Sequence, residues 1–250
     1  MSSSVLVTGA SSGLGAALAR AYAEPGATLH LSGRDRDRLD AVAAACRDGG
    51  AEVHAATLDV THAPAVAAWV AESEARAPLD LVIANAGISA GTHGGGESAA
   101  QVRAIFAVNV DGVFNTVMPA LGPMMERRRG QIGIMSSLAG FRGFPGAPAY
   151  CASKAAVRVW GEGLRAEMAG KGVGVSVICP GFVETPMTAV NNFRMPLLMQ
   201  VDEAAAIIRR GLAHDRGRIA FPWPMHVAAR IAGCLPSRIM DAVAGFTPKK

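Results

Sequence analysis

Short apolar runs alternate with longer segments of helical period along most of this 250-residue chain. The runs are nearly continuous, as expected of strands buried on both faces. They lie at residues 5–7, 28–31, 53–56, 81–84, 132–135, 175–178 and 218–221. The helical segments between them include 13–24, 36–48, 63–76, 98–127 and 149–170. Because such alternation builds right-handed βαβ crossovers, it predicts an α/β fold: a Rossmann-type, doubly wound parallel sheet of about seven strands with helices on both faces.

The first apolar run leads directly into a glycine-rich turn, TGASSGLG at residues 8–15, which opens the first helical segment. Glycines at positions 9, 13 and 15 permit a tight turn and let a pyrophosphate approach the backbone, where the helix N-terminus offers free N–H groups. The alternative interpretation is a simple strand-to-helix connection. The TGxxxGxG spacing resembles that of the short-chain dehydrogenase/reductase (SDR) family, and the resemblance extends over roughly residues 5–221.

This resemblance implies a nicotinamide dinucleotide site built from the ends of several strands. The predicted cofactor residues are Gly9, Ser11, Ser12, Gly13, Leu14, Gly15, Arg34, Asp59, Val60, Asn85, Ala86, Gly87, Tyr150, Lys154, Pro180, Gly181, Val183 and Thr185. In the family, the residue at Asp59 contacts adenine, Val183 meets the carboxamide and Thr185 lies near the phosphates. Asp59 could instead cap a helix, and Pro180 and Gly181 could form a plain turn. Family members usually have Asn-Asn-Ala-Gly where this chain has Ala84-Asn85-Ala86-Gly87, a change expected to loosen one local hydrogen bond.

The second apolar run ends in Gly33 and Arg34, where such folds recognise the adenosine ribose. An acidic side chain there would bond a free 2′-hydroxyl and repel a 2′-phosphate, whereas Arg34 offers a guanidinium that suits the phosphate. Asp35 follows Gly15 by 20 residues, near the usual distance of a ribose-binding acid, but we interpret it as the N-cap of the next helix. NADP(H) is therefore the predicted cofactor, with NAD(H) as the alternative.

Tyr150 and Lys154 are four residues apart in a helical segment and therefore share one helix face. A free tyrosine has a pKa near ~10, and a nearby ammonium favours its phenolate, so Tyr150 could exchange a proton with a C–O–H group. Taken alone, such a pair is usually a surface contact. Ser137, however, ends the fifth apolar run, where parallel sheets place their active sites. Ser136 is the rival for this role, and the resemblance favours Ser137.

The resemblance adds Asn109, which in the family holds a water that connects the lysine to solvent. Its alternative is a core-helix asparagine satisfied by backbone groups. The predicted catalytic residues are Asn109, Ser137, Tyr150 and Lys154. Together they predict an NADP(H)-dependent oxidoreductase that interconverts a ketone or aldehyde and an alcohol, with Tyr150 as general acid/base. The alternatives are a catalytically silent NADP-sensing protein, which typically lacks the Tyr or the Lys, and an NAD-dependent alcohol dehydrogenase.

Two segments are expected to surround the substrate. Residues 186–201, rich in Met and Leu, are predicted to form a substrate lid, which favours an apolar substrate unless these residues merely pack the lid. Residues 222–250 form a C-terminal extension with an apolar face and Trp223 at one end. The face comprises Met225, Val227, Ala228, Ile231, Ala232 and Leu235. It could lie on a membrane surface, but such a helix more often packs on its own domain or on a second subunit.

Composition narrows the remaining possibilities. Half of the residues are hydrophobic and no repeat or long linker divides the chain, so a single domain is expected over residues 1–250. A net charge of +4 with only 5 % aromatic residues does not favour a nucleic-acid surface, and Arg127-Arg128-Arg129 are interpreted as a solvated helix end. No transmembrane span, signal peptide or metal site is predicted. Four scattered cysteines indicate reduced thiols and a cytoplasmic protein. The resemblance also implies a homodimer or homotetramer built on segments 98–127 and 149–170.

Overall fold

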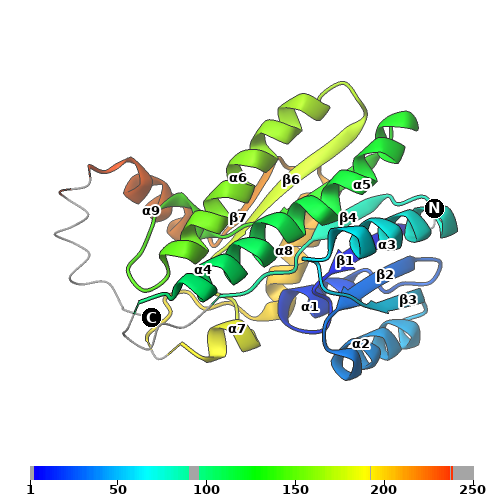
Figure 1. The fold of residues 1–250 in the computed structure, drawn as a ribbon, viewed down its shortest axis with the longest axis horizontal. Coiled ribbons are helices and arrows are strands. Elements are labelled where there is room, and N and C mark those ends of the chain that lie inside the picture. The colour runs from blue at the N-terminus through cyan, green and yellow to red at the C-terminus, as the bar shows by residue number, and fades with distance from the viewer. Residues whose placement is uncertain (1–2, 90–95, 192, 237, 239–250) are drawn as a thin grey trace.

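The computed structural model describes residues 3–89, 96–191, 193–236 and 238. Within these residues, seven parallel strands form one sheet in the order β3-β2-β1-β4-β5-β6-β7 (Figure 1). The strands are β1 (Ser4–Thr8), β2 (Thr28–Gly33), β3 (Glu52–Thr57), β4 (Leu81–Ala84), β5 (Gly130–Met135), β6 (Val173–Pro180) and β7 (Arg218–Phe221). Each contains one of the predicted apolar runs, so the predicted Rossmann-type sheet is confirmed.

The order of the strands reverses between β1 and β4. From β1 the chain builds outward to β3, then returns to the other side of β1 and builds from β4 to β7. Val7 pairs with Leu31 of β2 and with Ile83 of β4, so the carboxyl ends of these strands lie at one edge of the sheet. Connections that leave this edge toward opposite faces open a crevice, which is where doubly wound folds bind their ligands.

Helices cover both faces of the sheet, and α4 to α6 cross the face nearer the viewer in Figure 1. The opposite face packs against α1 (Gly13–Ala21), α2 (Arg36–Asp48) and α8 (Val201–Ala213). The nearer face packs against α3 (Ala63–Arg76), α5 (Gly112–Glu126) and α6 (Pro148–Met168).

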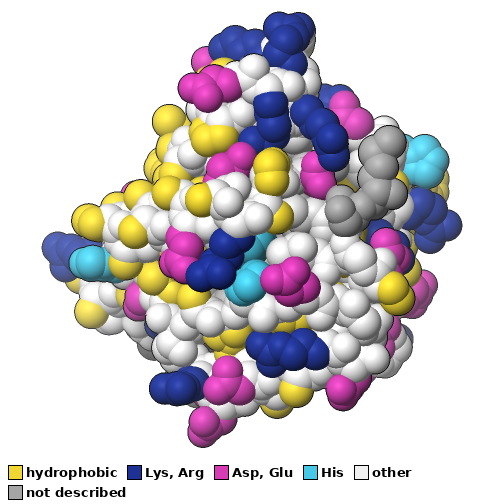
Figure 2. All heavy atoms as spheres, turned by 90° about the vertical axis from the view of Figure 1, so that its right-hand side faces the viewer, with side chains coloured by type: hydrophobic (Ala, Val, Ile, Leu, Met, Phe, Trp, Pro, Cys, Tyr) yellow, Lys and Arg dark blue, Asp and Glu magenta, His cyan; other side chains and the backbone are white. Residues whose placement is uncertain are grey.

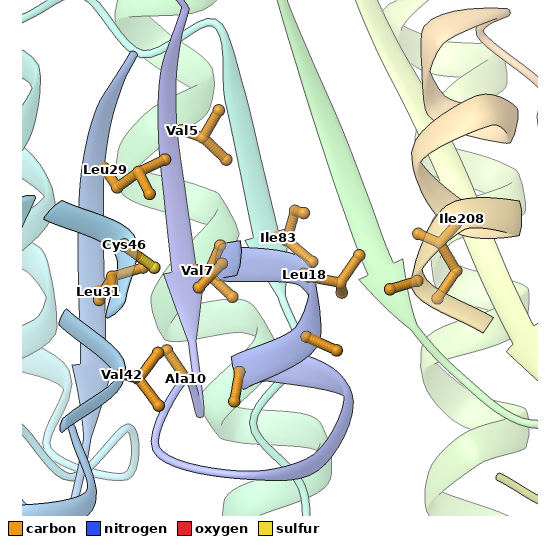
Figure 3. Packing of buried hydrophobic residues seen from close by; sticks show 14 of the residues in the cluster. Val5, Val7, Ala10, Leu18, Leu29, Leu31, Val42, Cys46, Ile83 and Ile208 are labelled. Atoms are coloured by element: carbon orange, nitrogen blue, oxygen red, sulfur yellow. The ribbon is translucent and has the colours of Figure 1, made fainter. Parts of the chain in front are cut away.

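Alternation along each strand explains why both faces are apolar. In β1, Val5 and Val7 belong to the core under α1, α2 and α8, whereas Leu6 belongs to the core under α3, α5 and α6. Figure 3 shows the first of these cores, in which Val5 and Val7 lie among side chains from β2, β4 and the covering helices. Successive strand residues point to opposite faces, so a strand with helices on both sides must be apolar throughout.

Two helical features differ from the prediction. Helix α8 is not among the predicted helices, although its buried Ala204, Ala205, Ile208 and Leu212 recur at helical spacing. The predicted helix 98–127 is divided into α4 (Ala99–Phe106), a π-helical segment η1 (Ala107–Asp111) and α5. The segment Ala99–Glu126 is long and apolar enough to cross a membrane, but 56 % of its most apolar window is buried in the molecule, as expected of a core helix.

Of the arginines that follow α5, Arg128 and Arg129 are exposed, as expected of a solvated helix end, but for Arg127 that interpretation is wrong. Arg127 is half-buried, forms an ion pair with Glu74 of α3 and donates to the carbonyl of Leu79. Arg129 pairs with Asp80 at 2.6 Å. These arginines therefore join the end of α5 to the segment between α3 and β4. On the face drawn in Figure 2, basic side chains are interspersed with acidic ones.

The C-terminal extension begins with α9 (Trp223–Cys234), which packs beside β7 and a 3-10 helix, η2 (Leu138–Phe141). Met225 and Ala229 contact the small core at this edge, whereas Trp223 and Ile231 are 72 % and 57 % exposed. The predicted apolar face of α9 is therefore divided between the protein's own core and the surface. Residues 237 and 239–250 of the extension, and residue 192 of the predicted lid, lie outside the described part of the chain.

Leu18 of α1 is fully buried in the first core, in the part of it that also holds Ile208 of α8 (Figure 3). Leu18→Ala is expected to lower the free energy of unfolding by about 2–5 kcal/mol, because it removes buried methyl groups and leaves a cavity. Ile231→Ala, at an exposed site of α9, is expected to change it by no more than about 0.5 kcal/mol. Urea unfolding measures both, and equal losses would contradict this packing.

Candidate active site

The turn after β1 has the backbone conformation that its glycines allow. Gly9 and Gly13 have φ angles of +68° and +54°, in the left-handed region that favours glycine. Gly15 is packed so closely that a Cβ there would lie 2.2 Å from the carbonyl oxygen of Gly9. The glycines therefore place no side chain of their own between the first turn of α1 and the crevice, where the backbone N–H groups that begin a helix can bind an anion.

Asn85, at the end of β4, attaches that strand to the glycine-rich turn. Its side-chain amide donates to the carbonyl oxygens of Thr8 at 2.9 Å and Gly9 at 3.3 Å. In return, the Thr8 hydroxyl accepts from the backbone N–H groups of Asn85 and Ala86 at 3.1 and 3.2 Å. The turn around Asn85 is thus held from both sides although Ala84 replaces the family's first asparagine.

A cavity of about 600 Å³ lies at the crevice, within the usual range for a small-molecule site. The structure places every predicted cofactor residue in its lining, from Gly9 in the first turn to Thr185 after β6. Ser137, Tyr150 and Lys154 also line it, whereas Asn109 does not. The sequence-predicted binding residues and three of the four predicted catalytic residues therefore share one cavity.

The end of β2 forms one end of this cavity. Arg34 is exposed and lines it, and Asp35 caps α2, as we interpreted it from the sequence. The Asp35 carboxylate accepts from the backbone N–H of Arg38 at 3.0 Å and from its guanidinium at 2.8 Å, and these bonds lower the pKa of Asp35. A Cβ on Gly33 would lie 2.9 Å from the hydroxyl oxygen of Ser11, so the Ser11 hydroxyl lies at the same end.

Asp59 follows β3 and does not cap the next helix, because the N-cap of α3 is His62. Its carboxylate accepts from the backbone N–H and the hydroxyl of Thr61, at 2.9 and 2.8 Å. These bonds, the backbone one above all, lower the pKa of Asp59, and the positive charge of Arg34 adds to the effect. Asp59 is therefore an ionised group that lines the cavity near Arg34.

Lys154 and Tyr150 lie on one face of α6, with the lysine Nζ 5.8 Å from the centre of the tyrosine ring. Lys154 is only 3 % exposed and donates to the carbonyl of Met135, the last residue of β5, at 2.9 Å. Burial lowers the pKa of Lys154 to about 8, because a low-dielectric environment disfavours the ammonium. Burial also raises the pKa of Tyr150, while its hydrogen bond with Ser137 acts in the opposite direction.

The two serines after β5 have different roles in the structure. Ser137 shares a hydrogen bond with Tyr150, accepts from the backbone N–H of Ala139 at 3.1 Å and lines the cavity. Ser136 is buried and donates to the backbone carbonyl of Lys154 at 2.8 Å. Ser137 is thus the serine beside the tyrosine, and Ser136 holds α6 against the end of β5.

Asn109 lies in η1 and is fully buried. Its amide accepts from the N–H of Ile88 at 2.8 Å and donates to the Ile88 carbonyl and the Ser153 hydroxyl, at 2.9 and 3.0 Å. A Cβ on Gly87 would lie 3.2 Å from Lys154 Nζ and 3.3 Å from Asn109 Oδ1, so glycine leaves open the space between these atoms. Asn109 lies within the π-helical turn, a feature often found at functional sites.

The segment after β6 also lines the cavity. Val183 is buried there and forms a parallel bridge with Met199, which returns the predicted lid to the sheet. Thr185 begins the short helix α7 (Pro186–Ala189), and its methyl group would lie 3.2 Å from a Cβ on Gly13. The start of the lid therefore lies directly against the glycine-rich turn.

Comparison with known proteins agrees with this geometry. A family profile described as "short chain dehydrogenase" matches residues 3–195. The chain belongs to the short-chain dehydrogenase/reductase family. An uncharacterized oxidoreductase of Myxococcus xanthus is 41 % identical over 240 residues, which cover 96 % of this SDR and 95 % of that protein. The ketoacyl reductase HetN of Nostoc sp. is 34 % identical over 205 residues, which cover 81 % of this chain and 71 % of HetN.

Solved SDR structures are also similar to this chain. A short-chain dehydrogenase from Sphingobium yanoikuyae in complex with NADPH superposes with a TM-score of 0.81 at 29 % identity, covering 98 % of this chain and 94 % of that one. An SDR from Burkholderia phymatum in complex with NAD gives 0.83 at 26 % identity, covering 96 % and 95 %. This protein is accordingly an oxidoreductase of the SDR family, whose structural neighbours include complexes with either nicotinamide dinucleotide.

Several residues of this SDR line the cavity in addition to the predicted cofactor and catalytic residues, and some of them belong to the predicted lid or were weighed as alternatives. They are Gly33, Asp35, Arg38, Leu58, Ile88, Val108, Met135, Ser136, Pro186, Met187 and Thr188. Most of them lie within one to three residues of a predicted site residue, so the motifs at the ends of the strands had already indicated these segments. Arg38 is different, because it reaches the cavity from the first turn of α2, and no motif marked it.

Gly15→Ala is expected to weaken binding of a nicotinamide dinucleotide by this SDR by at least about tenfold, because the added Cβ must displace the turn or Asn85. Gly122→Ala in α5 is the matched control, since a Cβ there meets nothing within 4 Å. Fluorescence titration with NADPH and NADH measures the loss, and circular dichroism checks that both variants fold. Unchanged binding in Gly15→Ala would contradict the close packing of the turn.

Proposed function

We propose that this SDR reduces an apolar ketone or aldehyde, or oxidises the matching alcohol, with NADP(H) as cofactor and Tyr150 as general acid/base. The observation that carries the proposal is the meeting of Ser137, Tyr150 and Lys154 in the cavity that begins at the glycine-rich turn. A dinucleotide that lies along this cavity has its binding groups at one end and a proton donor at the other. A hydride and a proton can therefore be delivered to one carbonyl group in the same cavity.

The chain's own residues divide the proton chemistry among them. Bound NADP(H) supplies or accepts the hydride. In reduction, Ser137 holds the carbonyl oxygen by a hydrogen bond while Tyr150 donates its proton to that oxygen. The Lys154 ammonium stabilises the phenolate that remains. Asn109 holds a water in the space that Gly87 leaves beside Lys154, and through this water the proton is replaced from solvent.

The preference for NADP(H) is supported by the charges at the end of β2. Arg34 is exposed there with its guanidinium available to a 2′-phosphate, and the acid that follows it, Asp35, is engaged by Arg38. An Arg–phosphate contact is charge-assisted and about twice as strong as a neutral hydrogen bond. The similar structure with NADPH agrees with this choice, and the one with NAD marks the alternative.

The preference for an apolar substrate is supported by the residues near the proposed reacting end. Met187 of α7 lines the cavity, and Val183 is buried beside it. Met225 of α9 approaches from the other side, because its sulfur would lie 2.8 Å from a Cβ on Gly181. Methionine side chains adapt their shape to apolar ligands. The C-terminal extension therefore takes part in forming the proposed substrate site.

A homodimer or homotetramer in the cytoplasm completes the proposal. Met118 of α5 and Val159 of α6 are each more than half exposed, although both lie on long helices that otherwise cover the core. Phe114 and Trp160 pack edge to face between the same two helices, at 4.7 Å between ring centres. An apolar surface of this kind suits a second copy of the chain. Within the described residues no disulfide joins the cysteines, and their wide spacing in the sequence supports a reducing compartment.

Titration of nicotinamide fluorescence tests the choice of cofactor. The protein is expected to bind NADPH more tightly than NADH, and Arg34→Asp is expected to weaken NADPH binding by about 10–100-fold, because a charge-assisted bond to phosphate becomes a repulsion. Arg36→Asp is the control. It changes the net charge by the same amount, but Arg36 pairs with Asp40 and does not line the cavity. Tighter binding of NADH by the wild type would overturn the assignment.

The pH dependence of reduction tests the role of the buried lysine. With a pKa of about 8, Lys154 is charged at pH 7 and loses its charge as the pH rises, so kcat/KM for NADPH is expected to be flat below about pH 8 and to fall above it. Tyr150 stays protonated in this range because its own pKa is raised. Tyr150→Phe is expected to lower kcat by about 10²–10⁴-fold at every pH, with NADPH binding retained. A rate that rose from pH 7 to 9 would contradict this division of roles.

A further inference from the structure

The acid that follows Arg34 is unusual in being bound on both oxygens by a single residue. Asp35 Oδ1 accepts from the backbone N–H of Arg38 at 3.0 Å, and Asp35 Oδ2 accepts from Arg38 Nε at 2.8 Å. Both residues line the cavity, at the end where Arg34 and Gly33 also lie. The Arg38 and Asp35 side chains are 58 % and 40 % exposed, so solvent and a ligand in the cavity can both reach them.

An uncompensated carboxylate at this place would oppose NADP(H). It would repel a 2′-phosphate and offer an acceptor to the free 2′-hydroxyl of NAD(H). With Asp59, which lies near Arg34, the charged side chains Arg34, Asp35 and Arg38 sum to zero, whereas without Arg38 they would sum to −1. The guanidinium of Arg38 thus decides whether this end of the cavity presents a neutral or a negative surface to the cofactor.

We infer that Arg38 is a positioning residue for cofactor choice: by holding and neutralising the Asp35 carboxylate, it makes the end of β2 select a 2′-phosphate over a 2′-hydroxyl. The inference rests on the proposed use of NADP(H) and adds to it a residue that acts through its neighbour. Arg34 meets the phosphate, and Arg38 removes the charge that would oppose it. Replacing the Arg38 side chain alone should therefore shift the preference of this site from NADP(H) toward NAD(H).

The neighbouring arginine provides a matched comparison. Arg36 is on the same turn of α2, but its guanidinium lies 3.7 Å from Asp40 and the residue does not line the cavity. Removing Arg36 changes the net charge of the protein as much as removing Arg38 does. A difference between the two variants then reports the contact with Asp35 rather than the overall charge.

The test is a double-mutant cycle on Arg38→Gln and Asp35→Asn, with dissociation constants for NADPH and NADH from fluorescence titration. Arg38→Gln is expected to weaken NADPH binding about tenfold and to leave NADH binding unchanged or tighter. Asp35→Asn alone is expected to change NADPH binding less than about threefold, because its charge is already compensated. In the double variant, NADPH binding is expected to return to within about threefold of the wild type.

Each other outcome has a distinct meaning. If Arg38→Gln weakens NADPH binding and Asp35→Asn does not restore it, Arg38 binds the phosphate directly and the inference is overturned. An effect of Arg36→Gln equal to that of Arg38→Gln also overturns it. If the wild type itself binds NADH more tightly, the proposed cofactor fails instead. Thermal unfolding distinguishes misfolding from specificity, and the helix cap survives in each variant because Asp or Asn at position 35 still accepts from the backbone N–H.

Discussion

The junction between β1 and β4 is the contact on which the rest of the site depends. At this point the strand order reverses, and the Asn85 amide and the Thr8 hydroxyl tie the ends of the two strands together. These hydrogen bonds leave no room for a side chain at Gly15, so the first turn of α1 packs closely against Gly9 and Asn85. Because of this closeness, the backbone N–H groups at the start of α1 lie near the crevice.

The opposite end of the cavity depends on a buried cation. Removing an ammonium from water is costly, and Lys154 recovers part of this cost by donating to the Met135 carbonyl at the end of β5. The carbonyl of Lys154 itself accepts from Ser136, so the strand end and α6 hold each other at two points. The positions of Tyr150 and Ser137 follow from this attachment, since each lies within a turn of one of the anchored residues.

Much of this arrangement was predictable from the sequence, and the exceptions have physical reasons. The strands were found because burial on both faces leaves apolar runs, and Asp35 was interpreted correctly because a helix cap has a local signature. The π-helical turn around Asn109 was not found, since nothing in a helical pattern marks one extra residue in a turn. Arg127 was misread as solvated because its partner, Glu74, is distant in the sequence.

What the sequence by itself determined is the order of elements and the residue types at the ends of the strands, because both follow from local periodicity and from short motifs. Which of two adjacent serines meets Tyr150, and that Arg127 pairs with Glu74 rather than solvent, was decided only by tertiary structure. These choices depend on the direction of side chains from elements far apart in the chain. No spacing encodes that direction, because it is set by how α3, α5 and α6 pack against the sheet.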